Sequence, residues 1–255
     1  MAPPEFRLMK LMQLNVWLGR LTPQIVRLIE QESPDIICCQ EVFSAESTVV
    51  FPDNMFDVLQ QMTAAGGYPH VFFSPLWQMA IADTTAQMGN AILSRYPLSQ
   101  QETIFLSGVY NPNLTAETRV SNTRNAQFCK IDTPAGKLSL VNYHGWWEAT
   151  PVGSATSVEK MQLVADKART LSMPLIIAGD LNVDPTSPAM RVFDGFLEDL
   201  TATHTATETL SQLGKVRDVA CDHILVSDGV RVEAFTVRDE LVSDHRALVL
   251  EFSLS

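Results

Sequence analysis

Short apolar runs bounded by proline, glycine, asparagine or aspartate recur along the whole chain. Runs of this kind are typical of β-strands in a protein core. We expect strands at 8–16, 35–39, 70–73, 90–94, 125–132, 137–143, 174–178, 222–227, 230–237 and 246–252. The segments 125–132 and 137–143 predict a hairpin whose turn is Pro134-Ala135-Gly136.

Segments with helical periodicity are fewer. We expect helices at 22–32, 53–65, 157–171 and 187–196. The first of these begins with Thr22 as its cap and Pro23 in its first turn, which is the favoured placement for proline. The third follows the run Thr156-Ser157-Val158-Glu159, which has the pattern of a capping box.

Many strands with a few interspersed helices predict an α/β sandwich with antiparallel or mixed sheets. A purely parallel sheet is disfavoured, because a helix does not follow every strand. The sequence has no long linker, charge block or internal repeat. We therefore expect residues 1–255 to form one domain, with residues 1–6 as a flexible leader.

The composition indicates a folded protein with a sizeable core. Hydrophobic residues make up 46% of the 255 residues and charged residues 18%, which excludes a disordered chain. The formal net charge of -11 disfavours nonspecific coating of nucleic acid, because that binding depends on many lysine and arginine contacts to phosphate. The same net charge is compatible with an acidic cleft that holds a divalent cation.

The four cysteines have no spacing typical of a zinc site, and Cys38 and Cys39 lie in an apolar run. We expect buried free thiols, which favour a reducing, cytoplasmic compartment. No apolar stretch reaches the ~18 residues of a membrane span. The amino-terminal residues also lack the pattern of a secretory signal.

Polar side chains gather at the ends of the predicted strands. In PLIIAGDLNVDP (residues 174–185), Asp180 and Asn182 end an apolar run, and in a strand they would share one face. Similar groups follow earlier strands or precede the last two, namely Asn15, Glu41, His144, Asp222, Asp244 and His245. If the last two strands run antiparallel to the others, all these groups lie on one rim of the core.

This collection of side chains predicts phosphoester hydrolysis. Carboxylate and amide oxygens are hard ligands that suit Mg²⁺, Mn²⁺ or Ca²⁺. Two histidines beside carboxylates suit proton transfer or charge stabilisation near neutral pH. No serine or cysteine stands in a convincing nucleophile motif, so water is the expected attacking group.

The ordered segments LNVW, CQEV, GNAILSRYPL, VNYHG, AGDLNVDP, CDHILVS and VSDHRALVLEF cover nearly the whole chain. In this order they resemble the endonuclease/exonuclease/phosphatase superfamily, which has the deoxyribonuclease I-like fold. The resemblance implies a four-layer α/β sandwich of two packed mixed or antiparallel sheets flanked by helices. It also places the active site at one end of the sandwich.

The resemblance further implies a role for each matching residue. The metal site, for Mg²⁺ with Mn²⁺ or Ca²⁺ as alternatives, would use Asn15, Glu41 and Asp244. The catalytic and phosphate-contacting groups would be His144, Asp180, Asn182, Asp222 and His245. Asp180 would orient or deprotonate the attacking water, and Asp222 would pair with His245. Arg124 matches an arginine near the substrate phosphate.

The substrate stays open at this stage. A small phosphodiester or phosphomonoester is the first expectation, and a DNA or RNA nuclease is the alternative, although the long loops 107–123 and 199–218 contain few cations (Arg119, Lys215 and Arg217). A lipid phosphodiesterase would need a basic amphipathic helix or anchor, which we do not find. An inactive binding module would lack site residues, and none is missing. Trp146 and Trp147 would anchor their loop or shape the substrate site.

Overall fold

Two six-stranded sheets form the centre of the protein. The computed structural model describes residues 8–47, 54–81, 84–118, 120, 122–214 and 218–255. The first sheet contains, in spatial order, β11 (Val230–Val237), β12 (Leu248–Leu254), β1 (Met9–Asn15), β2 (Ile36–Ala45), β4 (Thr84–Ser94) and β3 (His70–Ile81). The second contains β5 (Leu98–Ser107), β6 (Arg124–Thr133), β7 (Gly136–Tyr143), β8 (Leu175–Asp180), β10 (Asp222–Val226) and β9 (Glu198–Asp199).

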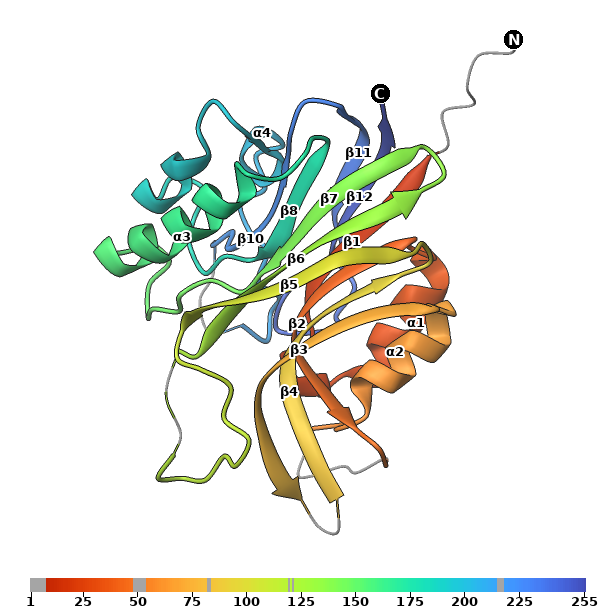
Figure 1. The fold of residues 1–255 in the computed structure, drawn as a ribbon, viewed down its shortest axis with the longest axis vertical. Coiled ribbons are helices and arrows are strands. Elements are labelled where there is room, and N and C mark those ends of the chain that lie inside the picture. Colours follow the sequence, from red (N-terminus) through yellow and green to blue (C-terminus); the bar gives the residue numbers. More distant parts are fainter. Residues whose placement is uncertain (1–7, 48–53, 82–83, 119, 121, 215–217) are drawn as a thin grey trace.

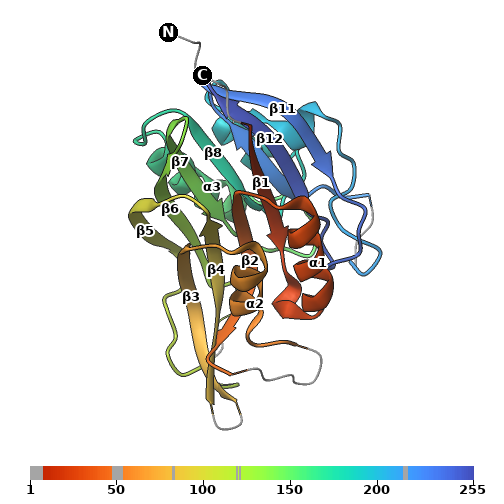
Figure 2. The same cartoon turned by 90° about the vertical axis from the view of Figure 1, so that its right-hand side faces the viewer.

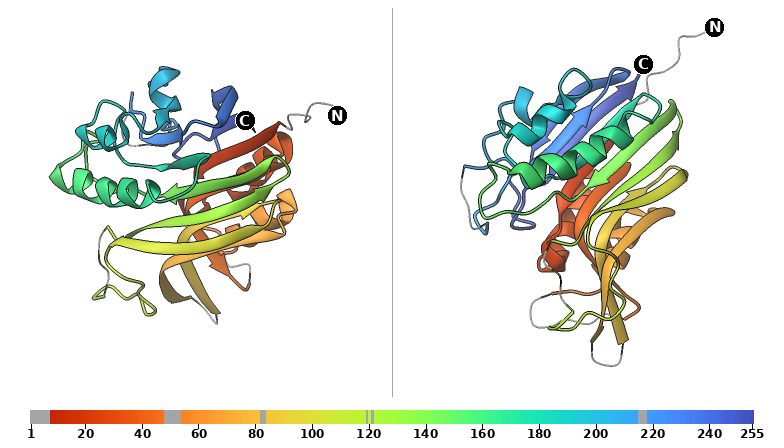
Figure 3. Two further views of the ribbon diagram at one scale, coloured as in Figure 1. Left: turned by 45° about the horizontal axis from the view of Figure 1, so that its top comes forward. Right: turned by 60° about the vertical axis from the view of Figure 1, so that its left-hand side comes forward.

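Helices cover the two outer faces of the sheet pair (Figures 1 and 3). Helices α1 (Thr22–Glu32) and α2 (Val58–Gly66) lie on the first sheet, as Figure 2 shows. Helix α3 (Ala155–Ala168) and the 3-10 helix η2 (Pro188–Phe193) lie on the second. The short elements η1 (Trp17–Gly19) and α4 (Leu200–Thr203) follow β1 and β9. The predicted four-layer α/β sandwich with mixed sheets is therefore confirmed.

The alternation of side chains along the central strands explains the layers. In β1, Leu11 faces the second sheet, whereas Met12 and Leu14 face α1 and α2. In β8, Ile176 faces the first sheet and Ile177 packs under α3. Because both faces of these strands are buried, their sequences are nearly continuous apolar runs.

The strand directions bring distant strand ends to the same edge of the molecule. Strands β1 and β2 are parallel, and β12 runs antiparallel to β1. Strands β7 and β8 are parallel, and β10 runs antiparallel to β8, with Asp222 opposite Asp180. The predicted reversal of these later strands is confirmed, so their amino ends meet the carboxyl ends of β1, β2, β7 and β8.

Several local predictions differ from the structure. Helix α3 is capped two residues earlier than predicted, because the Ser154 hydroxyl accepts hydrogen bonds from the amides of Thr156 and Ser157. Thr22 is not a cap, since Leu21 holds that position and the Thr22 hydroxyl donates to the carbonyl of Gly19. The helix predicted at 187–196 is the 3-10 helix η2.

Two strands were not predicted, and some predictions fall outside the described residues. Strand β5 was missed because its sequence LSQQETIFLS begins with polar residues and only one of its residues is fully buried, as befits an edge strand. The short strand β9 lies at the start of the predicted loop 199–218. The leader at residues 1–6 and the start of the helix predicted at 53–65 lie outside the description. No helix among the described residues is long and apolar enough to cross a membrane.

Candidate active site

At one end of the sandwich, the interior between the sheets is polar. Gln13 and Asn15 follow Leu11 on the inner face of β1, since alternate side chains share a face. Asp180 continues the inner face of β8 in the same way. Asn15 and Asp180 are almost fully buried, and the Nδ2 atom of Asn15 donates to Oδ2 of Asp180 at 3.0 Å. This hydrogen bond joins the two sheets at the predicted rim.

Glu41 reaches the rim through a break in its strand. The register of β2 against β4 shifts between Cys39 and Val42, and Glu41 there has a φ of 55°. This β-bulge redirects the side chain, as bulges beside active sites commonly do. Glu41 accepts a side-chain hydrogen bond from Asn15 and interacts electrostatically with His245, so both lie in one site.

Asn182 lies at the rim, but not on the strand face that the sequence predicted. Strand β8 ends at Asp180, and Asn182 has a left-handed φ of 58°. Its backbone amide donates to Oδ1 of Asp180 at 3.1 Å, and its Nδ2 atom donates to the carbonyl of Gly145 at 3.2 Å. The strand-face prediction is wrong because the chain turns immediately after β8.

Asp180 is the central carboxylate of the site. Its Oδ2 atom lies 3.5 Å from Nε2 of His144 and 3.7 Å from Nε2 of His245. Burial raises the pKa of Asp180 to about 6, although His245 and the hydrogen bond from Asn15 act in the opposite direction. A carboxylate with this pKa changes its protonation state close to neutral pH.

His245 is held by a buried carboxylate. Its Nδ1 atom lies 2.9 Å from Oδ2 of Asp222, which is fully buried at the start of β10. Burial disfavours the charged imidazolium, yet Asp222 and Asp180 outweigh it and raise the pKa of His245 well above its ordinary value. The geometry therefore favours a protonated His245 between two carboxylates.

His144 is in the opposite electrostatic situation. Burial, Arg124 and His245 all lower its pKa well below the ordinary value. Its Nδ1 atom is buried and has no hydrogen-bond partner among the described residues. The site thus contains a neutral histidine, His144, whose buried Nδ1 atom is unpaired among the described residues, and a charged histidine, His245.

Arg124 lies at the start of β6 and supplies a fixed cation. Its Nε atom donates to the carbonyl of Gly145 at 2.6 Å, and it interacts electrostatically with Glu41 and Asp180. Burial lowers its pKa, whereas these two carboxylates raise it. The structure therefore brings this residue, which only the family resemblance indicated, to the same rim.

Asp244 and Glu41 form an oxygen-rich pair. Burial raises the pKa of each carboxylate, and Glu41 adds to the effect on Asp244. Within the described part of the chain, neither forms a salt bridge with lysine or arginine. Together with the Asn15 amide, they offer the hard oxygen donors that suit Mg²⁺, Mn²⁺ or Ca²⁺. The chemistry of this donor set fits the predicted divalent cation.

All nine predicted site residues therefore lie at one end of the sandwich. Residues 12–245 match the model described as the Endonuclease/Exonuclease/phosphatase family. The chain belongs to this family. The resemblance noted in the sequence is thus confirmed.

Similar proteins in the family differ in size and in name. Human Nocturnin is 25% identical over 258 residues, which cover 87% of this chain and 55% of Nocturnin. The endonuclease/exonuclease/phosphatase structure from Beutenbergia cavernae has a TM-score of 0.72 at 21% identity, covering 98% of this chain and 72% of that one. The mannosyl-6-phosphatase Bt3783 from Bacteroides thetaiotaomicron has a TM-score of 0.67 at 19% identity, covering 96% and 100%.

These likenesses establish the fold more than the substrate. The chain spans 55% of the length of human Nocturnin and 35% of the length of rat Nocturnin. The named activities of these relatives therefore do not transfer directly.

Three residues beside the candidate site were not predicted from the sequence. Gln13 donates to Oδ1 of Asp222 at 3.0 Å, and the Thr209 hydroxyl donates to its Oδ2 at 2.7 Å. Cys221 lies beside Asp180 and His245. The position of Gln13, two residues before Asn15 on the same strand face, was an available signal. Thr209 gave none, because it comes from a loop.

The remaining predictions concern neighbouring side chains. His223 points away from the site, as predicted, and bonds to Asp199 and to the carbonyl of Val183 at 2.9 Å each. The carboxamide of Asn122 bonds to both the amide and the carbonyl of Trp147, which anchors that loop, and Trp147 is 57% exposed. The predicted loop cations Arg119, Lys215 and Arg217 lie outside the described residues.

Proposed function

We propose that this chain is a divalent-metal-dependent phosphoesterase in which water attacks the phosphorus of a phosphodiester or phosphomonoester. Members of the family are hydrolases that act on phosphoester bonds. The observation that carries the proposal is the convergence of Asn15, His144 and His245 on Oδ2 of Asp180. A buried carboxylate facing two imidazoles is suited to a proton transfer near neutral pH.

Asp180 is the group that accepts the proton from the attacking water. Its pKa of about 6 is close to working pH, as an efficient general base requires. His245 is the weaker candidate, because Asp222 favours its protonated form, which has no free lone pair. Asn15 and the amide of Asn182 fix the orientation of the Asp180 carboxylate.

The cationic groups stabilise charge on the phosphate. Protonated His245 and Arg124 can donate hydrogen bonds to its nonbridging oxygens, together with Asn182 and His144. Positioned donors of this kind typically lower the barrier by about 3 kcal/mol each. Asn15, Glu41 and Asp244 would hold the cation, Mg²⁺ or alternatively Mn²⁺ or Ca²⁺, which would neutralise further phosphate charge.

The substrate proposal stays at the level of small phosphate esters. The net charge of -11 argues against a protein that coats a long nucleic acid, and a related fold belongs to a mannosyl-6-phosphatase. A nuclease remains the alternative that a substrate screen must include. We also propose one catalytic domain, since the site uses both sheets, and a cytoplasmic setting, since all four cysteines are free.

A chelator-controlled substrate screen tests this function. Bis-p-nitrophenyl phosphate, p-nitrophenyl phosphate, sugar phosphates and short oligonucleotides would be offered to the wild type with EDTA, Mg²⁺ or Mn²⁺. We expect hydrolysis of at least one ester that EDTA abolishes and that Asp180→Ala reduces by roughly 10³-fold or more at unchanged fold. No turnover of any ester with either cation would refute the proposal and favour a binding module.

A further inference from the structure

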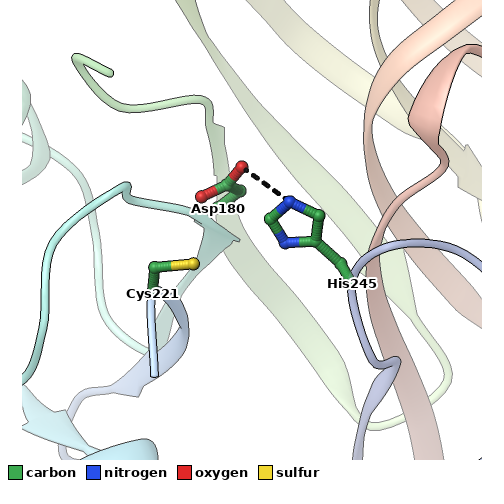
Figure 4. Close-up of side chains that lie close together, drawn as sticks. All are labelled: Asp180, Cys221 and His245. Carbon is green, nitrogen blue, oxygen red and sulfur yellow. Dashed lines mark ion pairs between the residues drawn. The ribbon is translucent and has the colours of Figure 1, made fainter. Parts of the chain in front are cut away.

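Cys221 places a sulfur atom inside the candidate active site. The Sγ atom of Cys221, a carboxylate oxygen of Asp180 and a ring nitrogen of His245 all lie within 4.8 Å of one another (Figure 4). All three side chains are buried. The carbonyl of Cys221 accepts a hydrogen bond from the amide of Leu181 at 2.8 Å, which fixes this residue beside the end of β8.

The two ring nitrogens of His245 have different partners, and the Sγ atom of Cys221 lies 3.7 Å from the Asp222 oxygen that contacts one of them. Its Nδ1 atom is engaged with Asp222 at 2.9 Å, so Nε2 is the nitrogen left for a ligand. Nε2 lies 3.7 Å from Oδ2 of Asp180, which is too long for a hydrogen bond but suits two ligands of one ion. A carboxylate behind a histidine is the arrangement that orients zinc-bound imidazoles.

The three donors differ in kind from those of the proposed Mg²⁺ site. Asn15, Glu41 and Asp244 offer only oxygen, whereas this group offers oxygen, nitrogen and sulfur. Hard Mg²⁺ avoids thiolate, and borderline-soft Zn²⁺ accepts all three donors in a four-coordinate site that leaves one position open. Ligand atoms of one zinc ion lie up to about 4 Å apart, so the three side chains, whose donor atoms lie within 4.8 Å of one another, would have to move closer together to bind it.

We propose that Asp180, Cys221 and His245 form a second cation site that takes Zn²⁺, and that zinc bound there stops hydrolysis. Binding forms Zn–O, Zn–N and Zn–S bonds, breaks the S–H bond of Cys221 and the Nε2–H bond of His245, and releases both protons to solvent. No electron transfer is involved. The inhibition rests on the proposed phosphoesterase function, because bound zinc would withdraw Asp180 and His245 from that reaction. The zinc binding itself does not depend on that function.

Cobalt spectroscopy tests the binding without any assay of activity. Co²⁺ would be added to the EDTA-treated full chain, to Cys221→Ala and to the matched control Cys129→Ala, which removes a buried thiol from the core between the sheets. We expect a near-ultraviolet thiolate-to-cobalt charge-transfer band in the wild type and in Cys129→Ala, and none in Cys221→Ala. Absence of the band from the wild type would overturn the proposal, whatever happens to the variants.

Zinc competition and inhibition complete the test. Against a chromophoric chelator, Cys221→Ala should bind Zn²⁺ at least about 10-fold more weakly than the wild type. In excess Mg²⁺, with the rate of each protein expressed relative to its own zinc-free rate, the variant should need at least about 10-fold more Zn²⁺ for half-inhibition. Equal zinc affinity or equal inhibition of the two proteins would refute the zinc site while leaving the phosphoesterase intact. Conversely, a Cys221-dependent cobalt band in a protein that hydrolyses no ester would support the zinc site and refute the proposed function.

Discussion

Gln13 and Asp222 are hydrogen-bonded across the two sheets, with Nε2 of Gln13 donating to Oδ1 of Asp222 at 3.0 Å between two fully buried side chains. The same Nε2 atom donates to Oε1 of Gln40, also at 3.0 Å. Gln13 therefore fixes the carboxylate that in turn holds His245. This contact connects the polar interior behind the rim to the candidate catalytic groups.

Replacing Gln13 with leucine should weaken the reaction through Asp222. The change leaves Oδ1 of Asp222 without its donor, which should cost about 1–3 kcal/mol of stability. We also expect kcat to fall by roughly 10-fold, the equivalent of about 1.4 kcal/mol. A double-mutant cycle with Asp222→Asn is the deciding measurement, since residues in one network are not additive. Additive effects on kcat would show that Gln13 acts only on the fold.

Removing the Asp222 charge should lower the pKa of His245. Because the folded pKa of His245 is raised, its stabilising contribution is fully present below about pH 6.5 and is lost as the pH rises through the folded value. In Asp222→Asn this contribution should be smaller, and its loss should be complete at a lower pH. Histidine ring NMR titration of the EDTA-treated protein measures the shift directly. His223 is the internal comparison and should shift less, because Asp199 contributes more than Asp222 to its raised pKa.

Asp180 should make the metal-free protein less stable as the pH rises. Its pKa increases from 3.8 to about 6 on folding, so between these values the unfolded chain loses the proton while the folded protein keeps it. Rising pH then favours unfolding, by roughly 2–3 kcal/mol in total. Asp180→Asn has no carboxyl group at this position, so it lacks this pH-dependent contribution to stability. Urea unfolding in EDTA should show the variant gaining stability over the wild type from pH 4 to about pH 6.5. A difference independent of pH would contradict the prediction.

The sequence predicted the rim of polar groups because strand periodicity is a simple rule. Asn15 and Asp180 stand at the ends of recognisable apolar runs, and the directions of β1 and β8 bring these ends to one rim. The rule failed where the backbone leaves the strand, at the bulge of Glu41 and the left-handed Asn182. Neither departure has a periodic signal.

The supporting contacts could not be predicted, because they join residues far apart in sequence. Gln13 meets Asp222 from the other sheet, and Thr209 meets it from a loop without a motif. The edge strand β5 was missed for a different reason, since hydrophobicity does not distinguish a partly polar edge strand from a loop. The family resemblance supplied residue roles, but not these partners.

Gly179 should be essential to the pairing of β7 and β8. A Cβ atom on this residue would overlap the carbonyl oxygen of Tyr143, which is backbone and cannot move aside. We expect Gly179→Ala to destabilise the protein by about 3 kcal/mol or more, in the range of severe core substitutions. Gly195→Ala is the control, because nothing lies within 4 Å of its added Cβ and only its φ of +69° is strained, at about 1 kcal/mol. Thermal and urea unfolding of both variants distinguish a clash from general intolerance of substitution.

Neutralising Glu41 should weaken the proposed Mg²⁺ site without abolishing the fold. In the metal-free protein the Glu41 carboxylate has a raised pKa and lies near Asp180, so Glu41→Gln removes an unfavourable charge and should leave stability unchanged or higher. With one of two carboxylates lost, the Mg²⁺ concentration for half-maximal activity should rise at least about 10-fold.

Glu46→Gln removes an exposed carboxylate just beyond the end of the same strand and should leave that concentration unchanged. Activity measured against Mg²⁺ for the three proteins separates local coordination from the general attraction of a chain with a net charge of -11. If the two variants behave alike, the cation is held elsewhere and the ligand assignment of Glu41 is wrong.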